Sequence, residues 1–441
     1  MKLFTSLLIL IFLQNCSFDN KSGIWNSDAT ISKKEKDLFK DFEALNVSSQ
    51  EFKKIIPIQK DFKFNKIASF DNNKWNDVLF NESNNLKNFK YNEKFNLVFK
   101  SKKISKFKID DNLLFEKDNI LSTDQNGNII TFSISENEII SKYNFYKKKY
   151  KKKKKKLNII IENDLAYVSD NLGYFYALKY KENKILWAKK YEVAFRSNIK
   201  IYKDKLITSN QNNQLYFINK NNGEILTIIP TEGTVIKNKF QNNISLNDKL
   251  SFFINTFGSL YAINNDNMRV IWFINLNQSL DLNPSNIFTG NQIVNDGNNL
   301  AISSNEFTYI IDLNTGSTLY KKNFSSELRP IILNKYFFTI TKNNFLIAMN
   351  INNGKIIYSY DLNLKIAEFL NIKKKDADIK NFMILNGKIV IFLQNSFILI
   401  SNINGNLEQI RKLPTKINSY PITIDKTLLY LDKKNKISII D

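Results

Sequence analysis

The sequence predicts an all-β protein, an eight-bladed β-propeller with four antiparallel strands in each blade. Two observations predict this fold. A hexamer of alternating apolar residues recurs eight times at spacings of 38 to 51 residues, and a second turn follows the copies at a fixed offset. A period near forty residues with about four short strands per unit is typical of a propeller. One blade cannot bury both of its faces, so successive blades are expected to stack around a common axis.

The repeat is clearest between Asn171 and Trp187, where two apolar strands flank a polar turn in the manner of a β-hairpin. The copies are anchored at Gly127, Gly173, Asn213, Gly258, Glu306, Asn344, Asn395 and Asn435. Ten residues after the anchor come the turn residues Asn137, Asn183, Gly223, Met268, Gly316, Gly354 and Gly405. Fourteen residues after it, four copies carry a large aromatic residue: Trp187, Trp272, Tyr320 and Tyr358. We interpret these aromatic residues as packing between neighbouring blades, in preference to binding a ligand.

The two ends of the chain complement each other. The last copy, residues 435–441, stops after its first strand, whereas residues 96–104 contain a spare segment that looks like the second strand of the motif. The sequence therefore predicts that this N-terminal strand completes the last blade and closes the ring. Closure removes open sheet edges, which would otherwise invite aggregation.

Residues 1–16 are predicted to be a lipoprotein signal peptide. A continuous apolar run, Leu7 to Leu13, follows Lys2 and is too short for a membrane-spanning helix. It ends at Leu13-Gln14-Asn15-Cys16, which is similar to the bacterial lipobox. Cys16, the only cysteine of the chain, is the expected lipidation site, and Ser17 after it favours the outer membrane. A plain signal peptide with an incidental cysteine is the alternative.

The rest of the chain divides into a tether and the propeller. Residues 17–57 are polar and weakly patterned, which predicts a flexible tether, and residues 58–441 are predicted to form the propeller domain. Longer inserts occur at residues 231–241, 275–292 and 366–381. Long loops on a rigid scaffold are natural sites of partner contact.

Composition limits the chemistry that the chain can perform. It contains no histidine, hence no imidazole base or histidine metal ligand, and one cysteine, hence no intramolecular disulfide. The formal net charge of +22 predicts attraction to anionic lipid or another polyanion. The basic run Lys147–Lys156 is either a solvated loop or a contact with anionic lipid headgroups. Only Tyr150 interrupts that run, so the stacking pattern of a nucleic-acid site is absent, and we expect no nucleic-acid partner.

The motif resembles the PQQ-like propeller repeat, most clearly at Gly173–Leu178 with Lys184–Trp187 and at Gly258–Ile263 with Val270–Trp272. The resemblance covers roughly residues 96–441. One branch of that superfamily comprises the quinoprotein dehydrogenases, which bind pyrroloquinoline quinone and Ca²⁺. Their adjacent cysteine pair is missing here, and no group of Asp, Glu or Asn residues has convincing calcium-ligand spacing. The other branch is the BamB family of outer-membrane lipoproteins, eight-bladed propellers that lack a cofactor and catalysis.

The resemblance to the BamB family implies a function. It implies a non-enzymatic scaffold, lipid-anchored on the periplasmic side of the outer membrane, which binds the barrel-assembly subunit and its complex and could also bind substrate barrels. It implies no cofactor, metal or catalytic residue. In that family a Leu-x-Leu-Arg segment contacts the barrel subunit. Its nearest match here is Val193-Ala194-Phe195-Arg196, so Phe195 and Arg196 are expected partner contacts. Asp281, in the longest insert, is a second expected contact, chosen on loop length.

Two other functions are left open by the sequence. One is a quinoprotein-type oxidoreductase that depends on pyrroloquinoline quinone, whose site a propeller could assemble from distant loops. The other is a propeller that binds cell-wall glycan or another envelope polyanion, which the charge of +22 would suit.

Overall fold

The computed structural model describes residues 17–18, 25–26, 52–150, 152–233, 241–277, 288 and 290–441. The chain forms two compact units, Met1–Gln50 and Glu51–Asp441. In the first unit, β1 (Ser17–Phe18) pairs antiparallel with β2 (Trp25–Asn26). Cys16 lies outside the described residues, as does Asp281. No helix in the part of the chain that the structure describes has the length and apolar character needed to cross a membrane.

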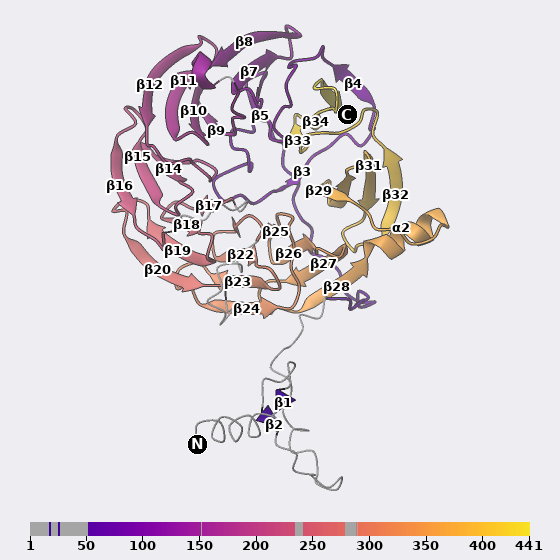
Figure 1. The fold of residues 1–441 in the computed structure, drawn as a ribbon. Coiled ribbons are helices and arrows are strands. Elements are labelled where there is room, and N and C mark those ends of the chain that lie inside the picture. The colour runs from indigo at the N-terminus through magenta and orange to yellow at the C-terminus, as the bar shows by residue number, and fades with distance from the viewer. Residues whose placement is uncertain are drawn as a thin grey trace, which may run out of the picture. The chain divides into compact units, whose positions relative to one another are not determined.

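The second unit is an eight-bladed β-propeller, which confirms the predicted fold class (Figure 1). Each blade is an antiparallel sheet of four strands that lie side by side. The innermost strand is at the central axis and the outermost strand is at the rim. The first three blades in chain order are β5–β8 (Leu114–Glu116, Asn119–Thr123, Asn128–Ser133, Glu138–Asn144), β9–β12 (Leu157–Glu162, Leu165–Asp170, Tyr174–Lys179, Lys184–Lys190) and β13–β16 (Lys200–Tyr202, Lys205–Ser209, Leu215–Asn219, Ile225–Ile229). The next three are β17–β20 (Asn243–Leu246, Leu250–Ile254, Ser259–Asn264, Val270–Asn275), β21–β24 (Val294–Asn295, Asn299–Ser303, Thr308–Asp312, Thr318–Lys322) and β25–β28 (Ile331–Leu333, Tyr336–Ile340, Phe345–Asn350, Ile356–Asp361).

The last two blades contain strands from the N-terminal part of the second unit. Blade seven consists of β29–β32 (Ile379–Leu385, Lys388–Leu393, Phe397–Ser401, Leu407–Lys412), with the short β3 (Asn88–Phe89) added in parallel to β29. Blade eight consists of β33–β35 (Ile422–Ile424, Thr427–Leu431, Ile437–Ile440) and, at the rim, β4 (Leu97–Lys100). Because β4 pairs antiparallel with β35, the predicted closure of the ring by an N-terminal strand is confirmed.

The repeated turn and the repeated aromatic residue meet at the boundary between blades. Gly223 has a φ of +73° and lies against the ring of Trp187, whose indole Nε1 donates to the Lys220 carbonyl at 2.9 Å. A Cβ on Gly223 would come within 2.5 Å of that ring, so only glycine allows this approach. The same arrangement places Trp272 on Gly316, Tyr320 on Gly354 and Tyr358 on Gly405. The aromatic residues therefore pack between blades, as interpreted from the sequence.

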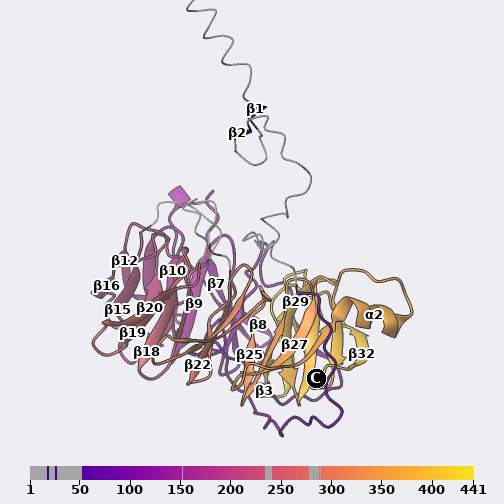
Figure 2. The ribbon, with the colours of Figure 1, turned by 90° about the horizontal axis from the view of Figure 1, so that it is seen from below.

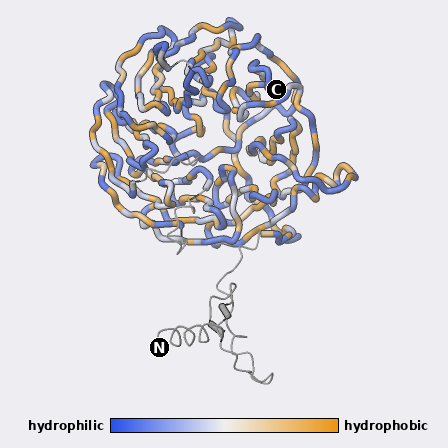
Figure 3. Tube along the Cα trace, viewed as in Figure 1, coloured by the Kyte–Doolittle hydropathy of each residue, from blue (hydrophilic) through white to orange (hydrophobic). Residues whose placement is uncertain are grey.

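Hydrophobic residues are distributed along the chain in every blade (Figure 3). Neighbouring blades share buried clusters, such as the one in which Phe175 and Trp187 of blade two pack with Leu206 and Tyr216 of blade three. Each blade thus buries the apolar face of its neighbour, as a repeat architecture requires.

The segment before the first blade, residues 52–96, is not a separate element. Phe52 packs edge-on against Phe324 and Phe345, and Ile56 exchanges backbone hydrogen bonds with Ser359 of β28. Phe64 then packs on Tyr336, with ring centroids 4.7 Å apart. The segment continues beneath the ring, which places residues 72–89 across the central axis (Figure 1).

We call residues 72–89 the plug segment, because it contacts the innermost strand of all eight blades. Its backbone bonds to Phe115 of β5, Ile161 of β9, Leu246 of β17 and Asn295 of β21. Side chains make the contacts to the other blades: Asn72 with Thr423, Asp77 with Lys200 and Asn85 with Ile332, while β3 pairs with β29. Four of these contacts, to Ile161, Leu246, Asn295 and Leu385, lie at or next to the last residue of the innermost strand.

The opposite face of the ring carries the long connections from the rim strand of one blade to the innermost strand of the next. One of them contains the single described α-helix, α2 (Leu362–Leu370), which follows β28. Asp361 caps its N-terminus by accepting from the Leu364 N–H, and Asn371 ends it in the left-handed region. Figure 2 shows the turn at η1 (Lys148–Tyr150) on the side of the ring opposite β3. We call this side the loop face.

Candidate functional site

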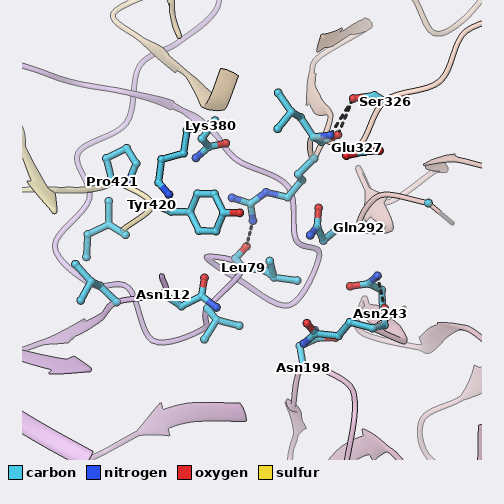
Figure 4. A pocket seen from close by; sticks show the side chains of 18 of the residues that line it. Leu79, Asn112, Asn198, Asn243, Gln292, Ser326, Glu327, Lys380, Tyr420 and Pro421 are labelled. Atoms are coloured by element: carbon cyan, nitrogen blue, oxygen red, sulfur yellow. Dashed lines mark hydrogen bonds between the residues drawn. The ribbon is translucent and has the colours of Figure 1, made fainter. Parts of the chain in front are cut away.

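A funnel opens at the centre of the loop face (Figure 4). Its volume is about 440 Å³, and its walls come from residues at or just before the first residue of the innermost strands. Trp75, Val78 and Leu79 of the plug segment also line it. Because the plug segment lies at the other end of these strands, it forms the floor of the funnel, which therefore opens toward the loop face.

Arg329 lies at the floor of the funnel. It precedes β25, and its guanidinium Nη1 donates to the carbonyls of Leu79 at 2.5 Å and Asn84 at 3.3 Å. Burial lowers the pKa of Arg329 to about 10, although the nearby Asp77 carboxylate opposes this shift. At neutral pH the guanidinium is therefore charged, and it fastens the plug segment to blade six.

Lys380 and Tyr420 form one wall of the funnel, with Gln292 across from them (Figure 4). Lys380, on β29, is only 7% exposed, and its ammonium lies 4.9 Å from the centroid of the Tyr420 ring. Burial lowers the pKa of Lys380, against the attraction of Asp111, and burial raises the pKa of Tyr420. The wall therefore combines a cation with a neutral phenol.

The funnel residues do not fit a calcium ion. Ca²⁺ takes six to eight oxygen ligands, several of them carboxylates. Glu327 is the only carboxylate among the described residues that line the funnel, and it is exposed to solvent. No cluster of three or more Asp, Glu, His or Cys side chains elsewhere in the described ranges could hold a metal ion. The described residues that line the funnel therefore do not supply the set of oxygen ligands that a calcium ion needs.

Phe195 and Arg196 lie in the connection between β12 and β13, on the loop face. Phe195 is only 4% exposed and packs on Phe175, Tyr191 and Tyr216 at the boundary between blades two and three. The Arg196 backbone N–H donates to the Ser209 carbonyl at 2.9 Å, and burial lowers the pKa of its half-buried guanidinium. The structure therefore holds Arg196 in place through the buried Phe195 beside it.

The basic run Lys147–Lys156 connects β8 to β9 and also belongs to the loop face. Lys148, Lys152, Lys153 and Lys154 are exposed, whereas Lys155 is only 3% exposed and lies over the Tyr146 ring. Within the run, Lys155 is thus packed against the protein, whereas Lys154 and Lys156 on either side of it present charge to solvent.

Asp110 has a carboxyl whose pKa is shifted by burial, and this shift makes the stability of the protein depend on pH. Its carboxylate accepts from the Thr123 hydroxyl at 2.5 Å, and burial raises its pKa to about 6. Because the folded pKa exceeds the unfolded value of 3.8, the folded protein binds the proton more tightly. The contribution of Asp110 to the free energy of unfolding therefore falls as pH rises from about 4 to 6.

Asp110→Asn is expected to be more stable than the unaltered protein at pH 7, by up to about 3 kcal/mol, and equal to it near pH 4. Chemical denaturation across pH 4–7 measures this difference. Asp312→Asn is the matched control, because hydrogen bonds from Thr315 lower the pKa of that exposed carboxyl. The control should therefore show no gain in stability between pH 4 and 6, and equal behaviour of the two variants would contradict the assignment.

A second surface lies on the rim of the ring. The outermost strands of blades two to five each have one unpaired edge. They also expose apolar side chains between 36% and 63%: Leu186, Ile225, Leu226, Ile228, Val270, Ile271, Phe273 and Leu319. We call these residues the rim band. Exposed apolar side chains on rim strands with an unpaired edge make this band a candidate contact surface.

The chain was compared with known families and structures. A family model described as "Outer membrane protein assembly factor BamB" matches residues 116–360, from the end of β5 to β28. No curated protein matches the sequence. The structure of BamB from Moraxella catarrhalis is 13% identical with a TM-score of 0.61, and the match covers 78% of this chain and 99% of that one.

Two solved enzymes share the fold at similar scores. A europium-containing methanol dehydrogenase is 11% identical with a TM-score of 0.59, and the match covers 83% of this chain and 89% of that one. Quinohemoprotein alcohol dehydrogenase from Comamonas testosteroni is 8% identical with a TM-score of 0.60, with coverage of 83% and 80%. At these identities the structural likenesses show the fold alone. The family match extends over more than half of the 441 residues, and the chain therefore belongs to the family of the outer membrane protein assembly factor BamB.

Proposed function

We propose that this protein is a non-catalytic scaffold lipoprotein of the outer-membrane β-barrel assembly machinery, and that it binds the barrel subunit through its loop face. The family match over residues 116–360 carries the proposal. The structure supports it by gathering the long connections between blades on one side of a closed, rigid ring. Such a ring presents loops in fixed positions, which suits binding of a folded partner.

Arg196 and the insert that contains Asp281 are the proposed contacts of the barrel subunit. Arg196 lies on the loop face, in the connection between β12 and β13. Asp281 lies outside the described residues, in the stretch of sequence between β20 and β21, and is proposed on the length of that insert alone. Arg196 is half-buried on this face, and arginine is enriched among the residues that dominate interfaces. Phe195 is proposed to act indirectly, because its ring is buried and fixes the position of the neighbouring Arg196.

The rim band is the proposed contact for substrate barrels. An unfolded barrel strand has alternating apolar side chains and unpaired backbone groups. The strand β20 exposes Ile271 and Phe273, two residues apart, beside an edge without a partner strand in the sheet. A substrate strand could pair with that edge and place its apolar side chains on the rim band, which is β-augmentation.

Lipidation of Cys16 is proposed to hold the protein at the periplasmic side of the outer membrane. Lys152, Lys153 and Lys154 expose positive charge on the loop face and are proposed to contact anionic lipid headgroups. Each lysine near an anionic membrane surface contributes about 1 kcal/mol of attraction, so three would assist a lipid anchor without replacing it.

Affinity purification from cell envelopes, followed by mass spectrometry, tests the proposal. The unaltered protein is expected to enrich the barrel-assembly subunit, and Arg196→Glu to reduce that enrichment at least about tenfold, because charge reversal at an interface costs more than 1.4 kcal/mol. Arg269→Glu is the matched control, since Arg269 is exposed in the turn between β19 and β20. Cys16→Ala should leave the outer-membrane fraction.

Two outcomes would contradict the proposal. One is the absence of any barrel-assembly component from the material bound by the unaltered protein. The other is a bound quinone, seen by absorbance in the purified protein, which would favour the oxidoreductase alternative instead.

A further inference from the structure

We infer that the funnel of the loop face is a binding site for a small organic anion with two or more carboxylates, held by Arg329, Lys380 and Tyr420. The inference concerns a ligand that the scaffold function does not require. It starts from charged groups in the funnel that lack protein partners on the side facing the cavity.

Arg329 keeps one edge of its guanidinium free. Its Nη1 is occupied by the carbonyls of Leu79 and Asn84, whereas Nε and Nη2 have no acceptor among the residues that the structure describes. These two nitrogens form one planar edge of the guanidinium, and such an edge fits the two oxygens of a carboxylate through parallel hydrogen bonds. The hydrogen bonds to the plug segment hold the guanidinium in place, so a ligand would meet a preorganised donor pair.

Lys380 supplies a second cation. Its ammonium lies over the Tyr420 ring and has no carboxylate within ion-pair distance in the described part of the chain. A nearly buried lysine that forms no ion pair with a described residue is unusual, because burial of an unpaired charge is costly, and Asp111 attracts this ammonium only from beyond ion-pair distance. An anion in the funnel would provide the missing partner.

Neutral polar groups complete the site. Tyr420 directs its hydroxyl toward the middle of the funnel, and the side-chain amides of Asn112 and Gln292 have no hydrogen-bond partner among the described residues (Figure 4). Among the described residues, the charged ones that line the funnel are Arg329, Lys342, Lys380 and Glu327, so cations exceed anions there by three to one. Glu327, the single anion of this set, is exposed to solvent.

The size of the funnel limits the ligand. A volume of about 440 Å³ falls in the range of small-molecule sites, roughly 300–1,000 Å³. The plug segment closes the floor, so a ligand must enter and leave through the loop face. A compact polycarboxylate can place one carboxylate on Arg329 and another near Lys380, whereas a monocarboxylate would leave one cation unpaired.

Isothermal titration calorimetry of the purified full-length protein with citrate, at constant ionic strength, tests the inference. Citrate should bind, and Lys380→Met should bind it at least tenfold more weakly. Lys189→Met, which removes the same charge from an exposed position on β12, should bind within twofold of the unaltered protein. Arg329 is left unaltered in this test because it also holds the plug segment. Trimethyl citrate, which has the shape but not the charge, should not bind.

Two peptides, tested in the same calorimetric experiment, identify the source of the carboxylates. A hexapeptide ending in Asp-Asp with a free C-terminus, compared with its Asn-Asn amide, tests whether a protein segment supplies them. Displacement of citrate by the acidic peptide would support the site and assign its carboxylates to a polypeptide. The inference is overturned if citrate gives no saturable binding at millimolar concentration, if sulfate binds equally well, or if Lys380→Met and Lys189→Met behave alike. None of these outcomes depends on the barrel subunit, so they are separate from the test of the scaffold function.

Discussion

Replacing Asp77 with alanine is expected to lower the free energy of unfolding by about 3–5 kcal/mol. Asp77 is the carboxylate partner of Lys200, whose side chain is 1% exposed, and the two charged atoms are 2.7 Å apart. The Lys200 ammonium also donates to the Asn81 carbonyl and the Asn84 side chain. Burial already lowers the pKa of Lys200, and Asp77 opposes that shift. Without the carboxylate, a charge would remain buried and uncompensated beneath the ring.

Equilibrium denaturation of the Asp77→Ala variant at neutral pH measures this loss. Asp71→Ala is the matched control, because Asp71 forms an ion pair of 2.6 Å with Lys90 in the same N-terminal segment, but both partners are exposed. Exposed pairs are screened by solvent and contribute little, so this control should hardly change stability. Equal losses in the two variants would show that the plug segment does not depend on the buried pair.

Deletion of residues 437–441 is expected to open the ring, with a loss of roughly 5–9 kcal/mol. The deletion removes Ile437, Ile439 and Ile440, which are all less than 9% exposed, and burial of each such side chain contributes roughly 1.5–3 kcal/mol. It also leaves β4 without its partner strand, because β4 pairs only with β35 in the described sheet.

Thermal unfolding and limited proteolysis after Lys100 or Lys102 provide the readout for this deletion. The intact protein should resist cleavage there, whereas the deleted form should be cleaved quickly because its rim strand is free. Lys434→Ala, an exposed position in the turn before β35, should stay within about 0.5 kcal/mol of the unaltered protein. A deleted form that unfolds at the same temperature as the intact protein would contradict closure by these two strands.

The blades could be predicted from the sequence because their pattern is local. Alternation of apolar residues, turn residues at a fixed offset and the aromatic at Trp187 or Trp272 all fall within about forty residues of one another. Closure by residues 96–104 could also be predicted, since one repeat was incomplete and one strand was spare. These features follow from the periodicity of a single structural unit.

The plug segment could not be predicted, because its contacts are long-range and polar. Asn84 bonds to the carbonyls of Ile244 and Ile293, which are 160 and 209 residues away. Asn85 reaches Ile332 at a separation of 247 residues. An asparagine-rich stretch without apolar alternation gives no signal for such contacts. The sequence contains a weak signal for helix α2. Asp361, a residue type that commonly caps helices, precedes the mixed apolar segment Leu362–Leu370.

The candidate site was only partly accessible to sequence reasoning. The Leu-x-Leu-Arg resemblance directed attention to Phe195 and Arg196, and the structure places Arg196 on the loop face but buries Phe195. Arg329 and Lys380 were missed. Among 64 basic residues, nothing in their local sequence distinguishes them, and only the closed ring brings both to one funnel.

The pairing of β4 with β35 has a consequence for the order of folding. Lys100 and Ser438 become neighbours although 338 positions separate them, so the blade that they share cannot form until the last residues of the chain are available. Such high contact order slows folding and prolongs the lifetime of open intermediates, whose unpaired rim strands can associate with other chains. The protein therefore passes through a stage in which it resembles its proposed clients: a sheet with free edges that needs protection until the final strand is in place.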